Sequence, residues 1–171
     1  MTKTPGNKLG LLTAVGAALL CAACSSGRKE KLQEALGRAQ LPLSASVDIA
    51  EQNVQRSTAV KAALLVDADP VYAVGALATG NLHDVRVDIT DGRVLGNVDM
   101  GASSVPCPGA VGLVEAITIA ESSMSGSAVS IQPDDDNECD REVQVLSAGR
   151  LWEVKVGPDG TVIEVELSDD D

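Results

Sequence analysis

The feature of this sequence that most constrains its fold is a pattern that occurs twice. Each half has one segment with helical spacing of apolar residues, and four short strand-like runs follow it. In the first half we predict a helix over residues 46–55, with Ser46 as its N-cap, and strands over 59–66, 71–78, 82–89 and 93–98. In the second half we predict a helix over 110–123 and strands over 128–132, 142–146, 151–156 and 161–167.

Turn sequences such as Asp91-Gly92 separate the runs, which favours antiparallel meanders. Apolar and acidic residues alternate along 161–167, as in a sheet that is wet on one face, and the other face needs a cover. We therefore expect an α+β fold of two small units, each one helix packed on an antiparallel meander sheet, over residues 43–100 and 109–167. Residues 101–108 are expected to be the linker, and 168–171 an acidic tail.

The N-terminus is typical of an export signal. Basic Lys3 and Lys8 precede an apolar stretch over 9–20 that is short for a membrane span. Small residues before Cys24 resemble a lipobox, in which the cysteine is acylated, although Cys21 stands where leucine is usual. We expect residues 1–23 to be a signal peptide and Cys24 to carry the lipid, so that acyl chains hold the protein to a membrane. Cleavage by ordinary signal peptidase, leaving a soluble secreted protein, is the alternative.

The segment 24–42 is polar and charged and lacks a broad apolar face, so we interpret it as a lipidated tether. A helix docked on the folded part is the other possibility. After processing, Cys107 and Cys139 remain in a compartment where thiols oxidise, and a structural disulfide between them is expected. A redox-active pair or metal ligation is the alternative, but no C-x-x-C is present and the single histidine, His83, lies in the other half.

The second half resembles the PepSY domain in the run GLVEAITIAE at 112–121, in LWEVKV at 151–156 and in DGTV at 159–162. The first half is similar in VDIAE at 47–51, VYAV at 71–74 and VRVDITDGRV at 85–94. In the second copy Gly157 replaces the usual aspartate, whereas in the first Asp88 is expected to hold turn amides with its side chain. The resemblance implies a cystatin-like helix-and-sheet module that binds or restrains peptidases or other envelope proteins, and it implies no catalytic residue.

The chain carries a formal charge of −12. It has no basic footprint for nucleic acid or for an anionic membrane surface, so we exclude a nucleic-acid partner. Five acidic side chains crowd the loop over 134–140, and four of them are weak candidates for calcium ligands: Asp134, Asp135, Asp136 and Glu138. The loop lacks the glycine and the distal glutamate of an EF-hand, and a solvated hairpin loop is the simpler interpretation.

Motifs for catalysis are absent from the sequence. His83 has no nucleophile at motif spacing and is expected to be a polar strand residue. Tyr72 and Trp152 are expected to fill the core rather than to anchor a partner. We therefore expect no enzyme activity and no cofactor.

Together these features predict an exported bacterial lipoprotein of the cell envelope that carries tandem PepSY-like binding or regulatory modules. Its expected partner is a peptidase or another envelope protein, and the membrane is reached through the lipid anchor alone. The alternative is an acidic structural or cation-buffering lipoprotein, tethered to the surface, in which charge matters more than shape.

Overall fold

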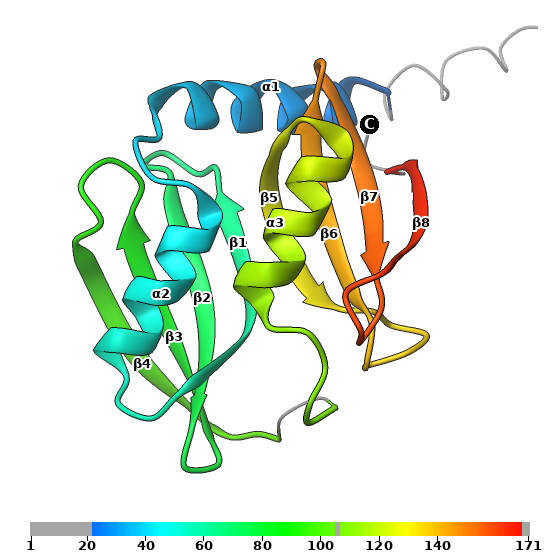
Figure 1. The fold of residues 1–171 in the computed structure, drawn as a ribbon. Helices are drawn as coiled ribbons and strands as arrows, with labels where there is room; N and C mark the ends of the chain where they lie inside the picture. The colour runs from blue at the N-terminus through cyan, green and yellow to red at the C-terminus, as the bar shows by residue number, and fades with distance from the viewer. Residues whose placement is uncertain (1–21, 105–106, 169–171) are drawn as a thin grey trace, which may run out of the picture.

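The computed structural model describes residues 22–104 and 107–168, and for residues 22–26 it describes the backbone only. Residues 1–21 and 169–171 lie outside the described residues. Most of the expected signal peptide and acidic tail, and part of the expected linker, therefore fall outside them too. The described chain is an α+β fold in which helices pack on an antiparallel sheet (Figure 1). The helices are α1 (Ala22–Arg38), α2 (Leu43–Asn53) and α3 (Leu113–Met124).

The strands form one sheet of eight in the order β4-β3-β2-β1-β5-β6-β7-β8. The first four follow α2 and the last four follow α3, and within each set consecutive strands pair in an antiparallel meander. Their bounds are β1 (Thr58–Leu65), β2 (Val71–Ala78), β3 (Asn81–Asp88), β4 (Val94–Ala102), β5 (Ser127–Pro133), β6 (Arg141–Ser147), β7 (Arg150–Val156) and β8 (Val162–Leu167).

The two meanders are joined into a single sheet, where the sequence pattern predicted two separate sheets. The first strands of the two halves, β1 and β5, pair antiparallel, with Ala62 opposite Ile131 and Ala63 opposite Ser130. An unpaired β1 would leave a bare row of backbone donors and acceptors, and pairing with β5 satisfies part of that row. The two halves therefore meet edge to edge, at the centre of the sheet.

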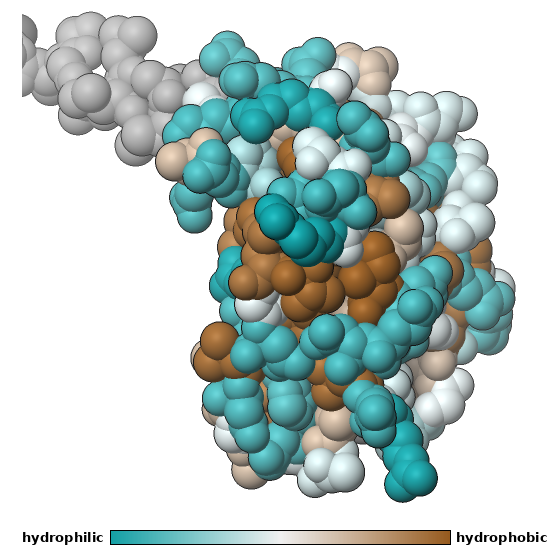
Figure 2. Space-filling model, turned by 90° about the vertical axis from the view of Figure 1, so that its left-hand side faces the viewer, coloured by the Kyte–Doolittle hydropathy of each residue, from teal (hydrophilic) through white to brown (hydrophobic). Residues whose placement is uncertain are grey.

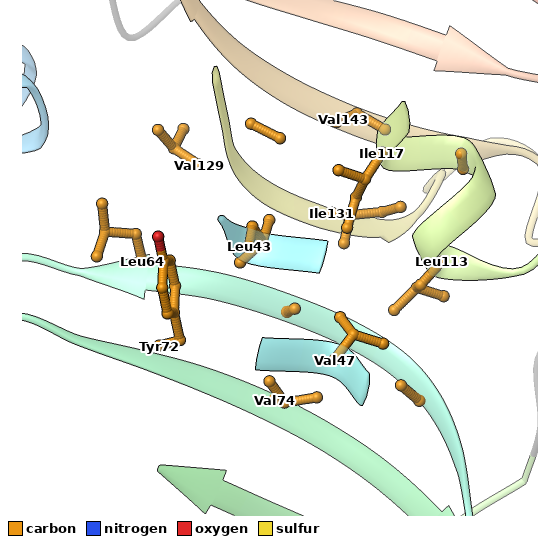
Figure 3. Packing of buried hydrophobic residues seen from close by; sticks show 14 of the residues in the cluster. Leu43, Val47, Leu64, Tyr72, Val74, Leu113, Ile117, Val129, Ile131 and Val143 are labelled. Atoms are coloured by element: carbon orange, nitrogen blue, oxygen red, sulfur yellow. The ribbon is translucent and has the colours of Figure 1, made fainter. Parts of the chain in front are cut away.

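Helices α2 and α3 lie next to each other on one face of this sheet (Figure 1). Their buried side chains belong to one hydrophobic cluster with those of the strands. In Figure 3, Val47 of α2 lies beside Val74 of β2, and Ile117 of α3 lies beside Ile131 of β5 and Val143 of β6. Neither half has a core of its own, so each half covers apolar surface that the other would expose.

Helix α1 runs across one end of the sheet (Figure 1), and it is docked rather than free. Leu32 and Ala35 are 1% and 0% exposed, and Leu36 and Ala39 pack partly buried against the same cluster. The expectation of a free tether over 24–42 is therefore wrong for this part of the chain. The apolar stripe at i, i+3, i+4 and i+7 is narrow and half of it is alanine, so the sequence pattern alone does not indicate that this helix docks.

Tyr72 ties the segment between α1 and α2 to the sheet. Its side chain is fully buried, and its hydroxyl donates a 2.7 Å hydrogen bond to the carbonyl oxygen of Leu41. Burial, followed by the nearby negative charge of Glu121, raises the pKa of Tyr72 to about 12. The prediction that Tyr72 fills the core is confirmed.

Helix α2 begins one turn earlier than the sequence predicted. Its N-cap is Pro42, which makes no side-chain cap, and Ser46 lies inside the helix. The hydroxyl of Ser46 is buried and donates to the carbonyl oxygen of Leu43 at 2.7 Å. Serine can satisfy itself within a helix in this way, so its presence did not mark the helix start.

A glutamate near the end of each sheet-covering helix holds the strand that follows it. Glu51 of α2 accepts a hydrogen bond from the backbone amide of Ala59 at 2.7 Å, and Glu121 of α3 accepts one from Ala128 at 2.9 Å. Both amides lie where the strand register shifts, a place at which a ladder amide loses its partner. In both halves, a glutamate side chain therefore supplies the acceptor that the strand amide loses at the register shift.

The turn between β3 and β4 forms as the sequence predicted. The Oδ1 atom of Asp88 accepts from the backbone amide of Thr90 at 2.8 Å and also from its hydroxyl. These bonds lower the pKa of the Asp88 carboxyl. Gly92 has a φ of +73°, and a Cβ there would come within 2.9 Å of Leu41, so this position needs glycine.

Candidate binding surface

Apart from α1, which crosses one end of the sheet, no described helix lies on the face opposite α2 and α3. Among the described residues, the outer sides of the edge strands β4 and β8 pair with no further strand. The edge strands β4 and β8 carry the large apolar side chains that are most exposed in the described chain, among them Val98 at 56% and Met100 at 62%. Figure 2 faces the β4 side of the molecule and shows a hydrophobic patch in its middle, framed by hydrophilic residues. Exposed apolar surface of this kind marks an interaction site in many soluble proteins.

A groove lies on the helix-free face over β1, β2 and β3. Its volume is about 420 Å³, which falls within the range of roughly 300–1,000 Å³ that is typical of ligand sites. The apolar part of its lining consists mainly of small residues of β1 and β2 and longer ones of β3 and β4, namely Ala63, Ala73, Gly75, Leu82 and Met100. Small side chains on two adjacent strands leave the space that forms the groove.

The charged residues of the groove are largely paired among themselves. A guanidinium nitrogen of Arg86 lies 2.7 Å from the Oδ2 atom of Asp84. The aliphatic stem of Lys61 lies over Gly75, where a Cβ would come within 2.9 Å of the lysine Cγ. A side chain at position 75 would push Lys61 away, so the glycine allows the lysine stem to form part of the wall.

Beyond β5, the same face becomes acidic. Register places Glu142, Lys155 and Glu164 in one row across β6, β7 and β8, and Gln144, Glu153 and Glu166 in the next. Their neighbours along β6 and β7, Val143 and Val154 among them, are buried beneath α3, so these polar side chains point to the helix-free face. Four carboxylates therefore share this part of the face with one described lysine.

The carboxylates of this acidic face repel one another. Burial raises the pKa of Glu142, and the charges of Asp134 and Asp135 add to the effect. Burial likewise raises the pKa of Glu153, with further contributions from Glu142 and Glu166. Both shifts mean that the folded protein holds these groups in a setting that disfavours their charge. A cation on this face would relieve that cost.

The acidic loop does not bring its carboxylates together. Asp134 is buried, its Oδ1 accepts hydrogen bonds from the amides of Asp136 and Asn137 at 3.0 Å, and its Oδ2 lies 2.9 Å from the Nζ of Lys155. Burial opposes ionisation of Asp134, but these bonds outweigh it and lower its pKa. In the described part of the chain no three acidic, histidine or cysteine side chains are grouped so that they could hold a metal. The loop is thus organised by Asp134 and Lys155, while Asp135 and Glu138 point to solvent.

The disulfide expected from the sequence is present. Cys107 and Cys139 are bonded, with a Cα–Cα distance of 4.9 Å. The bond ties the acidic loop to the segment that leads into α3. Both cysteines therefore serve the structure of the second half.

Cys24, the expected lipidation site, lies in the first turns of α1, and its side chain is among those not described. Its acylation stays a prediction. None of the helices in the described part of the chain combines the length and apolar character that crossing a bilayer requires.

His83 is one of the residues that line the groove, whereas Trp152 lies outside it. The Nδ1 atom of His83 lies 3.2 Å from the side-chain oxygen of Asn97, an amide oxygen that cannot act as a nucleophile. The ring of Trp152 is half-buried, and the guanidinium of Arg150 lies over it at 5.8 Å from the ring centre. The cation shields one face of the ring, which is therefore only partly a core residue.

Sequence reasoning missed the groove and the acidic face. The acidic rows follow from the alternation in β6, β7 and β8, but seeing them as one surface requires the register between strands. The signal for the groove is the cluster of small residues Ala63, Ala73 and Gly75, which alone could equally mark close packing.

Comparison with known proteins does not place the chain in a family. No protein-family model matches it, and no curated protein matches its sequence. Among solved structures, a putative lipoprotein from Clostridium difficile 630 is similar at 18% identity and a TM-score of 0.47, over 76% of this chain and 95% of that one. A similarity of this degree supports no conclusion about function, which has to be argued from the chain itself.

Proposed function

We propose that this chain is an exported lipoprotein, anchored through Cys24, whose folded part is a PepSY-like module that binds another protein of the cell envelope and catalyses no reaction. The observation that carries the binding role is the exposed apolar surface on the β4 side of the sheet, where Val98 and Met100 are more than half exposed. Solvation of such side chains costs free energy that a partner would recover.

Three features of the chain support the anchoring. Residues 1–23 have the charge, apolar length and small-residue ending of an export signal, and a cysteine follows at once. The disulfide between Cys107 and Cys139 suits an oxidising compartment. The net charge of −12 suits anchoring by acyl chains better than attraction to an anionic bilayer.

The PepSY-like assignment is supported by the twice-repeated order of one helix and four antiparallel strands. The paired roles of Glu51 and Glu121, which stand at matching places in the two resembling segments, support it further. A peptidase is the partner class that the resemblance suggests.

Anchoring is tested by mass spectrometry of the mature N-terminal peptide. We expect the chain to begin at Cys24 and to carry acyl groups, and the Cys24→Ser variant to lose both the lipid and the membrane association. A mature protein that starts at Cys24 with a free thiol would refute the anchor.

Binding is tested with a photo-crosslinking amino acid placed at Met100 in the membrane-anchored protein, with exposed Gln52 on α2 as the matched control position. We expect one envelope protein to be captured from position 100 and not from 52. Equal capture at both positions would refute a specific surface. If loss of the acidic side chains alone changed the phenotype while capture at 100 persisted, the cation-buffering alternative would be favoured.

A further inference from the structure

The helix-free face combines an apolar groove and an acidic surface on one continuous sheet. The groove spans β1 to β3 and also takes Ser130 and Gln132 of β5 into its lining. The acidic rows begin on the next strand, β6. No described helix separates the two regions.

The spacing between the two regions matches a short extended peptide. From Gly75 on β2 to Glu153 on β7 there are four strand intervals, which at about 4.8 Å each amount to about 19 Å. Six residues of extended chain cover about 20 Å. A segment that places an apolar side chain in the groove therefore brings residues about six positions away over the acidic rows.

The charge of the acidic rows indicates which residues the segment should carry at that end. Glu153 of β7 and Glu166 of β8 lie opposite each other in the register, and Gln144 of β6 continues that row. Glu142 lies in the neighbouring row, while Lys155 is already engaged by Asp134 at 2.9 Å. Lysine or arginine side chains would meet Glu142, Glu153 and Glu166, whose one described cationic neighbour, Lys155, forms its ion pairs with Asp134 and Glu164, whereas acidic side chains would be repelled.

From this arrangement we propose that the helix-free face binds an extended basic segment of a partner protein, with an apolar side chain of that segment in the groove and basic side chains over Glu142, Glu153 and Glu166. The proposal rests on the binding role proposed above and names the chemistry of the partner. The groove selects the apolar side chain of the segment by its shape. The direction in which the segment binds is set by the acidic rows, which lie on one side of the groove only. The resulting contact would be salt-sensitive, because most of it is ionic and near solvent.

A nine-residue fluorescent peptide, with one leucine near one end, two lysines near the other and glycine and serine between, is a direct probe. Anisotropy is measured with the full-length protein in uncharged detergent micelles. We expect saturable binding at low salt. Replacing leucine in the peptide by serine should weaken it roughly tenfold or more, and replacing the lysines by glutamates should abolish it.

Variants of the protein locate the site. The double change Glu153→Gln and Glu166→Gln should weaken binding by roughly 2- to 30-fold. The matched control Glu115→Gln, at an exposed position of α3 on the other face, should leave binding unchanged. Ala73→Trp, which fills the groove, should lower binding of the leucine peptide more than that of the serine peptide. Thermal unfolding of each variant checks that the fold is kept.

Three results would overturn the proposal: no binding of the basic peptide, equal loss in the Glu115→Gln control, or equal binding of the leucine and serine peptides. The last would mean that charge alone attracts the peptide. Because Met100 itself lines the groove, continued capture of one envelope protein from position 100 in any of these cases would leave the binding role standing, and only the assignment of an extended basic segment as the partner would fail.

Discussion

Shortening the Leu32 side chain tests whether α1 is part of the folded structure. Leu32 is 1% exposed and belongs to the main hydrophobic cluster, so Leu32→Ala removes three buried carbons. Changes of this kind cost about 2–5 kcal/mol in a core that cannot collapse. Because α1 lies at one end of the chain, it can open by itself, and we expect the cost to fall on that local opening at about 2 kcal/mol.

Hydrogen exchange followed by mass spectrometry reads this local opening directly. A loss of about 2 kcal/mol corresponds to about a 30-fold increase in the exchange of amides protected by local opening of α1, over residues 28–38. Amides of β2, an interior strand of the sheet, should change far less. The control is Gln33→Ala, one position along the same helix at an exposed site, which should leave exchange within about twofold.

Two results would refute the reasoning about α1. In the first, residues 28–38 exchange at the rate of an unstructured chain before any substitution. In the second, Gln33→Ala and Leu32→Ala have equal effects. Either result would show that this segment is the free tether that the sequence predicts.

Further predictions concern the disulfide, the buried tyrosine and the acidic face. Replacing Cys107 and Cys139 by serine should lower the free energy of unfolding in urea by roughly 3–4 kcal/mol, since the bond closes a loop with a separation of 32 residues, and an unchanged midpoint would contradict this. Tyr72→Phe leaves the carbonyl of Leu41 without its donor and should cost about 1–3 kcal/mol in the same assay, whereas a neutral effect would mean that water replaces the hydroxyl. The raised pKa of Tyr72 means that stability is complete below pH 10 and declines as pH rises towards 12, and the Phe variant should lack this decline in urea melts. Glu153→Gln should raise stability at pH 7, because a carboxyl with a raised pKa stabilises the fold only while it is protonated; the gain should vanish near pH 4, and a loss at pH 7 would reverse the assigned sign.

The order and type of the sheet-covering elements could be predicted from the sequence. Alternation and turn residues place the strand over 71–78 at the observed bounds of β2 and the others within a few residues. The Asp88 turn followed from side-chain chemistry that acts over two residues. Signals of this kind depend only on residues that are close together in the sequence, so the sequence alone is enough to predict them.

That the two halves pack together follows from how little each would bury alone, but the pairing of β1 with β5 and the docking of α1 could not be predicted. The β1–β5 contact depends on register between residues almost 70 positions apart, such as Ala62 and Ile131. Nothing in the sequence of either strand indicates that it pairs with the other. The burial of Leu32 and Ala35 depends on the end of the sheet that they cover, and this end forms only in the folded chain. The candidate surface depends on the same pairing, because the groove lies over β1 to β3 and the acidic rows lie on β6 to β8.

The pairing of β1 with β5 also has a consequence for how the chain folds. Every other strand pair joins consecutive strands, whose contacts are local and close quickly, whereas this pair must bring the two halves together. The disulfide closes a loop that contains α3 and β5, so its formation confines the second half before the halves meet. We therefore expect refolding in two kinetic phases, in which the meanders form first and their union is slower. A chain crossing a membrane from its N-terminus would expose the free edge of β1 until β5 emerges.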